Sequence, residues 1–155
     1  IHFTMWLMQT CDLPNMTQYI STSPQHTQTI AADFAQTVKG GAVIFLNGDL
    51  GSGKTTFVQG LAKGLGCEWP VRSPTFTLVN IYPTSHRYLT RIVHVDLYRL
   101  NKASELDPLA LEEYVNDQTV LLVEWPELLI GGRINPTNNV YMQTDDITKK
   151  IVIEP

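Results

Sequence analysis

Gly48-Asp-Leu-Gly-Ser-Gly-Lys-Thr55 is the stretch of this sequence that decides its fold. It fits the pattern G-x-x-x-x-G-K-[ST], in which a glycine-rich turn wraps around phosphate groups. Its glycines allow positive φ angles, so successive backbone N–H groups can point inwards at phosphate oxygens. The Lys54 ammonium would reach the β- and γ-phosphates, and the Thr55 hydroxyl would complete magnesium coordination. The pattern predicts a nucleotide contact at each of Gly48, Asp49, Leu50, Gly51, Ser52, Gly53, Lys54, Thr55 and Thr56.

The residues on either side of this loop supply the context that the pattern requires. Residues 42–47, Ala-Val-Ile-Phe-Leu-Asn, have the length and apolar composition of a buried parallel strand. After the loop, apolar residues recur at helical spacing until Gly66, which suits the C-terminal end of a helix. A strand, a tight turn and a helix in this order place phosphates at a helix N-terminus. We therefore reject a chance match and predict a nucleotide site.

The composition of the chain limits its class and its partners. At 155 residues with 43% hydrophobic and 17% charged residues, it suits one globular domain. A net charge of −4 argues against extensive direct contact with nucleic acid, but not against a partner that holds nucleic acid. The two cysteines, Cys11 and Cys67, lack metal-ligand spacing and favour reduced thiols in the cytoplasm.

The first fifteen residues differ from the remainder of the chain. Residues 1–8 are apolar, but they are too short to span a membrane and they lack a basic leader. We expect residues 1–15 to be either a poorly ordered extension without a membrane role or a stretch upstream of a natural start at Met16, and residues 16–155 to be one nucleotide-binding domain.

Alternating strand and helix patterns predict an α/β fold: three layers around a mixed, mostly parallel central sheet. Ser23 and Pro24 begin a helix, as N-cap and first helical residue, and Gly40-Gly41 is expected to end it. The other expected elements are an edge strand at 16–21, strands at 88–95 and 119–124, an amphipathic helix at 105–117, a helical turn at 127–130, and a hairpin of 139–143 with 149–153.

Two carboxylates stand at the ends of apolar strands, where open α/β sheets bind ligands. Asp96 follows one strand and Glu124 ends another. A phosphate-loop enzyme needs an acid for the magnesium shell and a group that orients water or an acceptor. Either carboxylate could fill either role. His94 shares a face with Asp96 and is expected to be a hydrogen-bonded structural residue.

The segment after the first phosphate-loop helix has two interpretations. Residues 71–82 begin with a loop rich in hydroxyl groups, which includes Arg72, Ser73 and Thr75, and their second half is β-prone. The loop forms either a switch that senses the γ-phosphate or an ordinary turn before a hairpin.

Two further patterns bear on the nucleotide and the reaction. The run Asn101-Lys-Ala-Ser104 lacks the Asp of a guanine-binding motif, so ATP is favoured over GTP. The arginines do not cluster as they do in the lid of a small-molecule kinase, and such a kinase is therefore the alternative rather than the first hypothesis.

Four ordered runs together resemble the TsaE (YjeE-type) family over roughly residues 20–155. They start at Gly48, Ser73, Asp96 and Glu124 and read GDLGSGKTTF, SPTFTLV, DLYRL and EWPE. Members of this family are small bacterial ATPases of tRNA threonylcarbamoyladenosine biosynthesis. The resemblance implies slow intrinsic hydrolysis of Mg-ATP in support of a TsaB–TsaD pair that modifies adenosine at position thirty-seven of tRNA. The tRNA would be met only through that complex.

Carried over by position, the resemblance also assigns residues. It implies Lys54, Asp96 and Glu124 as catalytic groups, and Thr55, Asp96 and Glu124 as magnesium ligands. Thr75 and Trp125 join the nucleotide contacts, although a half-buried aromatic plug is the plainer interpretation of Trp125. Ser52 stands where the family commonly has alanine, a change that the backbone chemistry of the loop tolerates.

Overall fold

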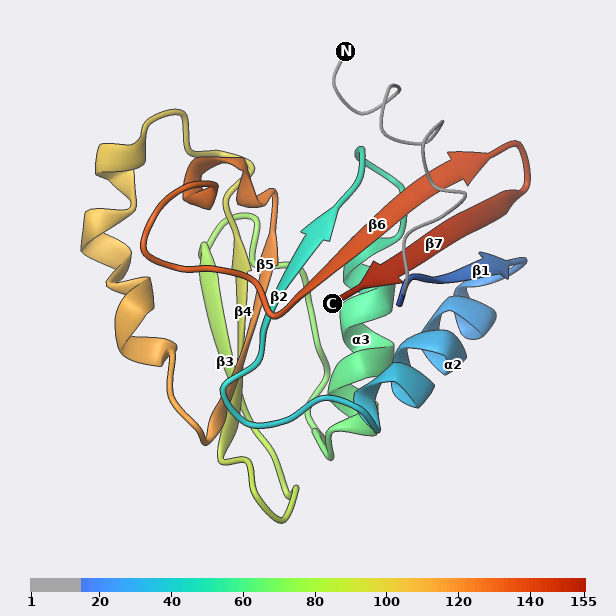
Figure 1. The fold of residues 1–155 in the computed structure, drawn as a ribbon, viewed down its shortest axis with the longest axis horizontal. Helices are drawn as coiled ribbons and strands as arrows, with labels where there is room; N and C mark the ends of the chain where they lie inside the picture. The colour runs from blue at the N-terminus through green and yellow to red at the C-terminus, as the bar shows by residue number, and fades with distance from the viewer. Residues whose placement is uncertain (1–14) are drawn as a thin grey trace.

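One mixed sheet runs through residues 15–155, the part of the chain that the computed structural model describes (Figure 1). Within these residues it has seven strands: β1 (Thr17–Ser21), β2 (Val43–Asn47), β3 (Val79–Pro83), β4 (Arg91–Asp96), β5 (Thr119–Glu124), β6 (Asn138–Asp145) and β7 (Thr148–Glu154). Their order across the sheet is β1-β7-β6-β2-β5-β4-β3. The extension expected at residues 1–15 lies outside the described residues, apart from its last residue.

The four central strands, β6, β2, β5 and β4, are parallel, whereas β1, β7 and β3 join the sheet in antiparallel pairs. β2 and β5 are continuous apolar runs because both of their faces are covered. The predicted mixed sheet with a parallel core is confirmed. Parallel pairing also aligns strand ends, so Asp96 at the end of β4 stands opposite Glu124 at the end of β5.

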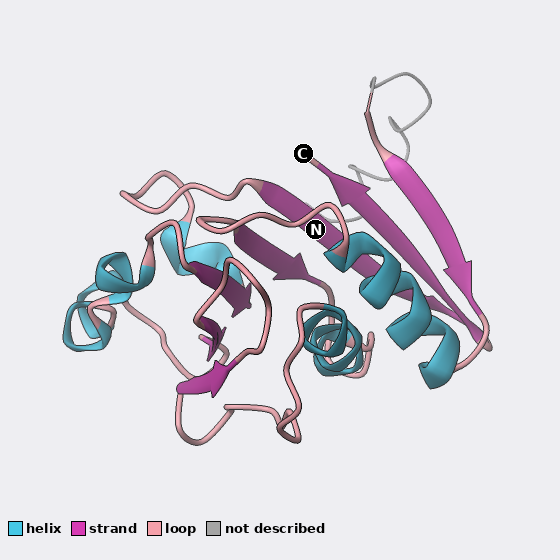
Figure 2. Ribbon diagram, turned by 90° about the horizontal axis from the view of Figure 1, so that it is seen from below, coloured by secondary structure: helices cyan, strands magenta, loops and turns pink. Residues whose placement is uncertain are grey.

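Helices cover the sheet on both faces, which confirms the three layers (Figure 2). α2 (Pro24–Ala35) and α3 (Lys54–Gly64) lie on one face. On the other lie four short 3₁₀ helices, namely η1 (Ala103–Glu105), η2 (Asp107–Leu109), η3 (Leu111–Tyr114) and η4 (Pro126–Leu129). Alternation along β2 divides the core: Ile44 and Leu46 pack under α2 and α3, whereas Val43 and Phe45 face the 3₁₀ helices.

α2 and α3 pack against each other at a glycine. A Cβ atom on Gly60 would lie 2.3 Å from the backbone oxygen of Gln28. Beside this contact, Gln28 Nε2 donates to Gln59 Oε1 at 3.1 Å. Because α3 carries Lys54 and Thr55 in its first turn, this packing fixes where the phosphate-loop residues lie relative to the sheet.

Several predicted boundaries were wrong. The helix expected at 105–117 is instead a series of 3₁₀ turns, because Pro108 interrupts the α-helical hydrogen bonds and Ala110 adopts a left-handed conformation with φ 46°. α2 ends at Ala35 rather than at Gly40, and β4 begins at Arg91 rather than at residue 88.

Two local predictions about helix ends are confirmed. Ser23 caps α2 by accepting from His26 N at 3.0 Å, and Gly66 follows α3 with φ 82°. The two strands of the C-terminal hairpin extend further than expected and leave a tighter turn. Among residues 15–155, the helices are all too short or too polar to cross a bilayer.

Candidate nucleotide site

The phosphate loop joins β2 to α3 and depends on glycine at its strained positions. Gly48, Gly51 and Gly53 all have positive φ angles, of 156°, 76° and 101°. Gly48 also approaches the neighbouring strand closely, since a Cβ atom there would lie 2.5 Å from Met142 O. Gly53 is the N-cap of α3 and no side chain caps the helix. The first N–H groups of α3 are therefore available to an anion, as a phosphate loop requires.

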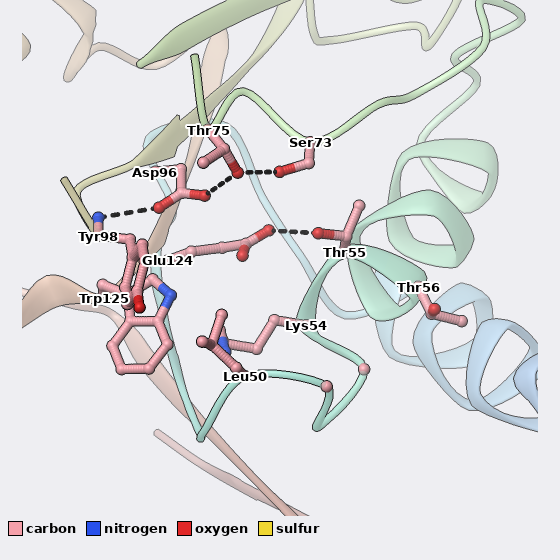
Figure 3. A pocket seen from close by; sticks show the side chains of 12 residues that line it. Leu50, Lys54, Thr55, Thr56, Ser73, Thr75, Asp96, Tyr98, Glu124 and Trp125 are labelled. Carbon is pink, nitrogen blue, oxygen red and sulfur yellow. Dashed lines mark hydrogen bonds between the residues drawn. The ribbon is translucent and has the colours of Figure 1, made fainter. Parts of the chain in front are cut away.

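A pocket of about 360 Å³ opens over this loop (Figure 3). Its volume lies in the range of small-ligand sites. It brings together residues from all four runs that carry the family resemblance: Leu50, Gly51, Gly53, Lys54, Thr55, Thr56, Ser73, Thr75, Asp96, Tyr98, Glu124 and Trp125 line it. Of the predicted contacts, Gly48, Asp49 and Ser52 do not line this pocket.

Lys54 is the buried cation of the site, with 5% of its surface exposed. Its Nζ donates to the carbonyl oxygens of Gly48 at 2.6 Å and Asp49 at 3.0 Å, and lies 4.3 Å from the centre of the Trp125 ring. Burial lowers the pKa of Lys54 below its ordinary value, while the nearby carboxylates, Glu124 first, oppose that shift. The loop thus holds a desolvated cation close to where phosphates would bind.

Glu124 is paired with the first turn of α3. Its Oε1 accepts a hydrogen bond from Thr55 Oγ1 at 3.0 Å and lies 2.8 Å from His94 Nε2. Only 4% of Glu124 is exposed. A serine or threonine at this loop position and an acid at a neighbouring strand end are the usual protein ligands of nucleotide-bound magnesium.

Asp96 is paired with the hydroxyl-rich loop instead. Its Oδ2 accepts from Thr75 Oγ1 at 3.0 Å, and its Oδ1 accepts from the backbone N of Tyr98 at 2.9 Å. Thr75 Oγ1 also shares a hydrogen bond with Ser73 Oγ at 2.6 Å. The two strand-end acids, adjacent in register, therefore contact different segments: Glu124 contacts α3, and Asp96 contacts the loop before β3.

Trp125 forms a wall of the pocket in a strained backbone conformation. Its φ of 56° and ψ of 59° are left-handed, a region that costs a non-glycine residue about 1–2 kcal/mol. The right-handed helical region is disfavoured for it because Pro126 follows. Its ring contacts that of Tyr98, with centroids 4.9 Å apart. This conformation places the indole beside Lys54, with the ring centre 4.3 Å from Nζ.

The oxygen ligands of the site suit magnesium shared with a nucleotide. Within residues 15–155 there is no group of three or more His, Cys, Asp or Glu side chains that would hold a metal alone. One hydroxyl and one or two carboxylates beside a phosphate loop are instead what Mg²⁺ uses when phosphates and waters complete its shell.

A second hollow, of about 130 Å³, adjoins the first and was not predicted from the sequence. Gly53 and Thr56 line both. Lys149 of β7 also lines it, and its Nζ donates to Gly51 O at 2.5 Å and Thr144 Oγ1 at 2.7 Å. Its other lining residues are Ser21, Thr22, Ser23, Pro24, Thr27 and Ile147, which come from opposite ends of the described chain and form no motif.

Comparisons with known proteins agree on one family. The family model described as "Threonylcarbamoyl adenosine biosynthesis protein TsaE" matches residues 21–151. The proteins of that name from Bacillus subtilis and Haemophilus influenzae are 44% and 39% identical over 69% and 66% of this chain, which spans 65% and 62% of their lengths. The Rickettsia bellii relative is 40% identical over 86% of this chain and 91% of its own. The crystal structure of Bacillus subtilis YdiB superimposes with a TM-score of 0.71 at 29% identity, over 92% of this chain and 86% of that one.

Proposed function

Because the chain belongs to the TsaE family, we propose that it hydrolyses Mg-ATP in support of threonylcarbamoyladenosine formation on tRNA. The observation that carries the proposal is the hydrogen bond from Thr55 to Glu124 in the pocket above the phosphate loop. This bond joins the hydroxyl and the acid that nucleotide hydrolysis requires, and it lies at the N-terminus of α3, which would hold the phosphates.

The two acids have different roles in this proposal. Thr55 and Glu124 would hold magnesium, which when bound offsets the charge that develops on the phosphate oxygens. Lys54 would turn from the loop carbonyls to the phosphates, which are stronger acceptors. Asp96 would orient the attacking water, and Thr75 would link it to the loop that senses the γ-phosphate.

The second hollow is the proposed position of the base and ribose. It lies next to the phosphate pocket and is lined by hydroxyl groups, by Ile147 and by Lys149. An exposed apolar side chain such as Ile147, 91% of which is exposed, would gain from contact with the flat face of a base. ATP is the proposed nucleotide, because the sequence lacks the Asp of a guanine motif.

The partners belong to the proposal as well. We expect slow hydrolysis by the isolated chain and productive hydrolysis with TsaB- and TsaD-like proteins, in the cytoplasm. The net charge of −4 suits a protein that meets tRNA only through such a complex.

The test uses purified chain with and without those two partner proteins. Lys54→Ala should abolish phosphate release and multiple-turnover threonylcarbamoylation of tRNA, because the buried cation that contacts the phosphates is lost. Lys63→Ala, on an exposed site of the same helix, is the matched control and should retain both. Multiple turnover by the Lys54→Ala protein at the wild-type rate would refute the proposed role.

The same assay separates hydrolysis from the kinase alternative. With ATP labelled on its γ-phosphate, hydrolysis releases the label as free phosphate, whereas a kinase would attach it to a metabolite. The comparisons do not favour the kinase, since the matched family is named for threonylcarbamoyl adenosine biosynthesis.

A further inference from the structure

His94 lies behind the site and contacts one of its acids. It is the fourth residue of β4 and is fully buried, as is the neighbouring strand β5. Its Nε2 lies 2.8 Å from Glu124 Oε1. His94 does not line the pocket, so any effect that it has on a bound nucleotide must pass through Glu124.

The surroundings of the imidazole indicate which atom donates. Among the described residues, Nδ1 of His94 has no hydrogen-bond partner. A proton on Nδ1 would leave a buried N–H without an acceptor, and the lone pair of Nε2 would then face the carboxylate. A proton on Nε2 can instead be donated to Glu124, so we place it there. Glu124 Oε1 therefore accepts two hydrogen bonds, from His94 on the sheet and from Thr55 on α3.

The two donors hold the carboxylate in one orientation. Glu124 Oε1 is directed at Thr55, and the second oxygen points to the side of the pocket where Lys54 lies (Figure 3). Among the carboxylates around Lys54, Glu124 does most to oppose the lowering of the Lys54 pKa, so this acid is its nearest candidate for an ion pair. Without the His94 donor, the flexible side chain of Glu124 would be free to pair with Lys54 and to occupy the space of the phosphates.

We propose that His94 is a positioning residue, which holds Glu124 beside Thr55 and keeps it from pairing with Lys54. The proposal rests on the proposed function, because it assigns Glu124 to the magnesium that accompanies ATP. Hydrogen-bond partners of this kind fix the geometry of ligating carboxylates in other metal sites, and their loss typically reduces metal affinity or activity about 10–100-fold.

The test replaces His94 in two ways that differ only in the donor. His94→Leu has no donor, whereas His94→Gln places an amide N–H near the position of Nε2. His86→Leu, in the turn before β4, is the matched control. Three quantities are measured: the rate of ATP hydrolysis, the affinity for a fluorescent ATP analogue with and without Mg²⁺, and the free energy of unfolding in urea.

We expect His94→Leu to reduce both hydrolysis and the gain in nucleotide affinity that Mg²⁺ provides by about tenfold or more. The affinity without Mg²⁺ should stay within about threefold of wild type, and His94→Gln should restore most of the loss. In the Glu124→Gln background, His94→Leu should change the Mg²⁺-dependent gain by less than about twofold, because the two residues act as a unit.

Three results would overturn the inference. The first is that His94→Leu hydrolyses ATP and responds to Mg²⁺ like wild type. The second is that His94→Leu reduces the Mg²⁺-dependent gain equally in the wild-type and Glu124→Gln backgrounds, and the third is that it reduces nucleotide affinity as much without Mg²⁺ as with it. If His94→Leu fails to fold, His94→Asn takes its place, since its shorter amide does not reach Glu124. A wild-type chain that never hydrolyses ATP, alone or with partners, would instead refute the proposed function and this inference together.

Discussion

Helix propensity and packing predict opposite effects of Gly60→Ala on the stability of the folded protein. In the interior of α3, alanine is favoured over glycine by about 0.8–1.0 kcal/mol, so propensity alone predicts a more stable protein. The structure predicts the reverse, because the new Cβ atom would lie 2.3 Å from the backbone oxygen and 2.5 Å from the Cα of Gln28. A backbone obstacle does not move aside as a flexible side chain does, so α2 and α3 must separate.

The magnitude follows from these two terms. Overpacking of this kind costs about 1–3 kcal/mol, and a contact with backbone belongs at the upper end. After subtraction of the propensity gain, we expect a net loss of about 1–2 kcal/mol and a Tm lower by several degrees.

Urea unfolding of Gly60→Ala measures this loss, with Lys63→Ala on the exposed side of α3 as a control that should stay within about 0.5 kcal/mol of wild type. Because α3 carries Lys54, nucleotide affinity should also fall. A Gly60→Ala protein more stable than wild type would refute the close packing of the two helices.

Three further predictions concern the cap, the buried lysine and the loop. Ser23→Ala removes the acceptor of His26 N and should cost about 1 kcal/mol in urea unfolding, whereas Ser23→Asp should retain most of the stability. Lys54→Met should be more stable than wild type at neutral pH. The lowered pKa means that keeping Lys54 charged in the folded chain costs free energy of folding. The stability difference between Lys54→Met and wild type should therefore shrink as pH rises towards the ordinary lysine pKa of 10.5. Urea unfolding of both proteins at several pH values measures this difference. A stability difference that grows with pH would contradict the lowered pKa of Lys54. Thr75→Val should keep nucleotide binding but slow hydrolysis by about tenfold or more, because Asp96 loses its donor; Ser73→Ala, one step further from Asp96, should have a smaller effect.

The features that were predictable from the sequence are those with local causes. The strand at 119–124 was predicted residue for residue, because a continuous apolar run ends at the Trp125-Pro126 pair. The phosphate loop and its helix were equally clear, since glycine spacing and helical periodicity act within a few residues of each other. The predicted helix at 105–117 failed because its amphipathic pattern looks helical, while Pro108 and the left-handed Ala110 break the backbone that would carry it.

The arrangement of the site depended on contacts between distant residues. Both strand-end acids were identified, but which of them meets Thr55 is decided by strand register and by side-chain orientation. His94 was expected to be structural, and nothing in its neighbours along the chain pointed to Glu124, thirty residues away. The contact of Lys149 with the phosphate loop was not predictable for the same reason, because Lys149 lies on β7 and its partner Gly51 is far away in the sequence.

The pairing of β1 with β7 has a consequence for how the protein is made. Thr17 lies opposite Ile153, and within the described residues β1 pairs with β7 alone. A chain that leaves the ribosome from its N-terminus can pack α2 against α3 early, but β1 must wait until residues 148–154 of β7 have been translated. The hollow beside the phosphate loop, lined by Ser21 from one strand and Lys149 from the other, is completed by that last step. A nascent chain would therefore possess the phosphate loop well before it possesses the full nucleotide site.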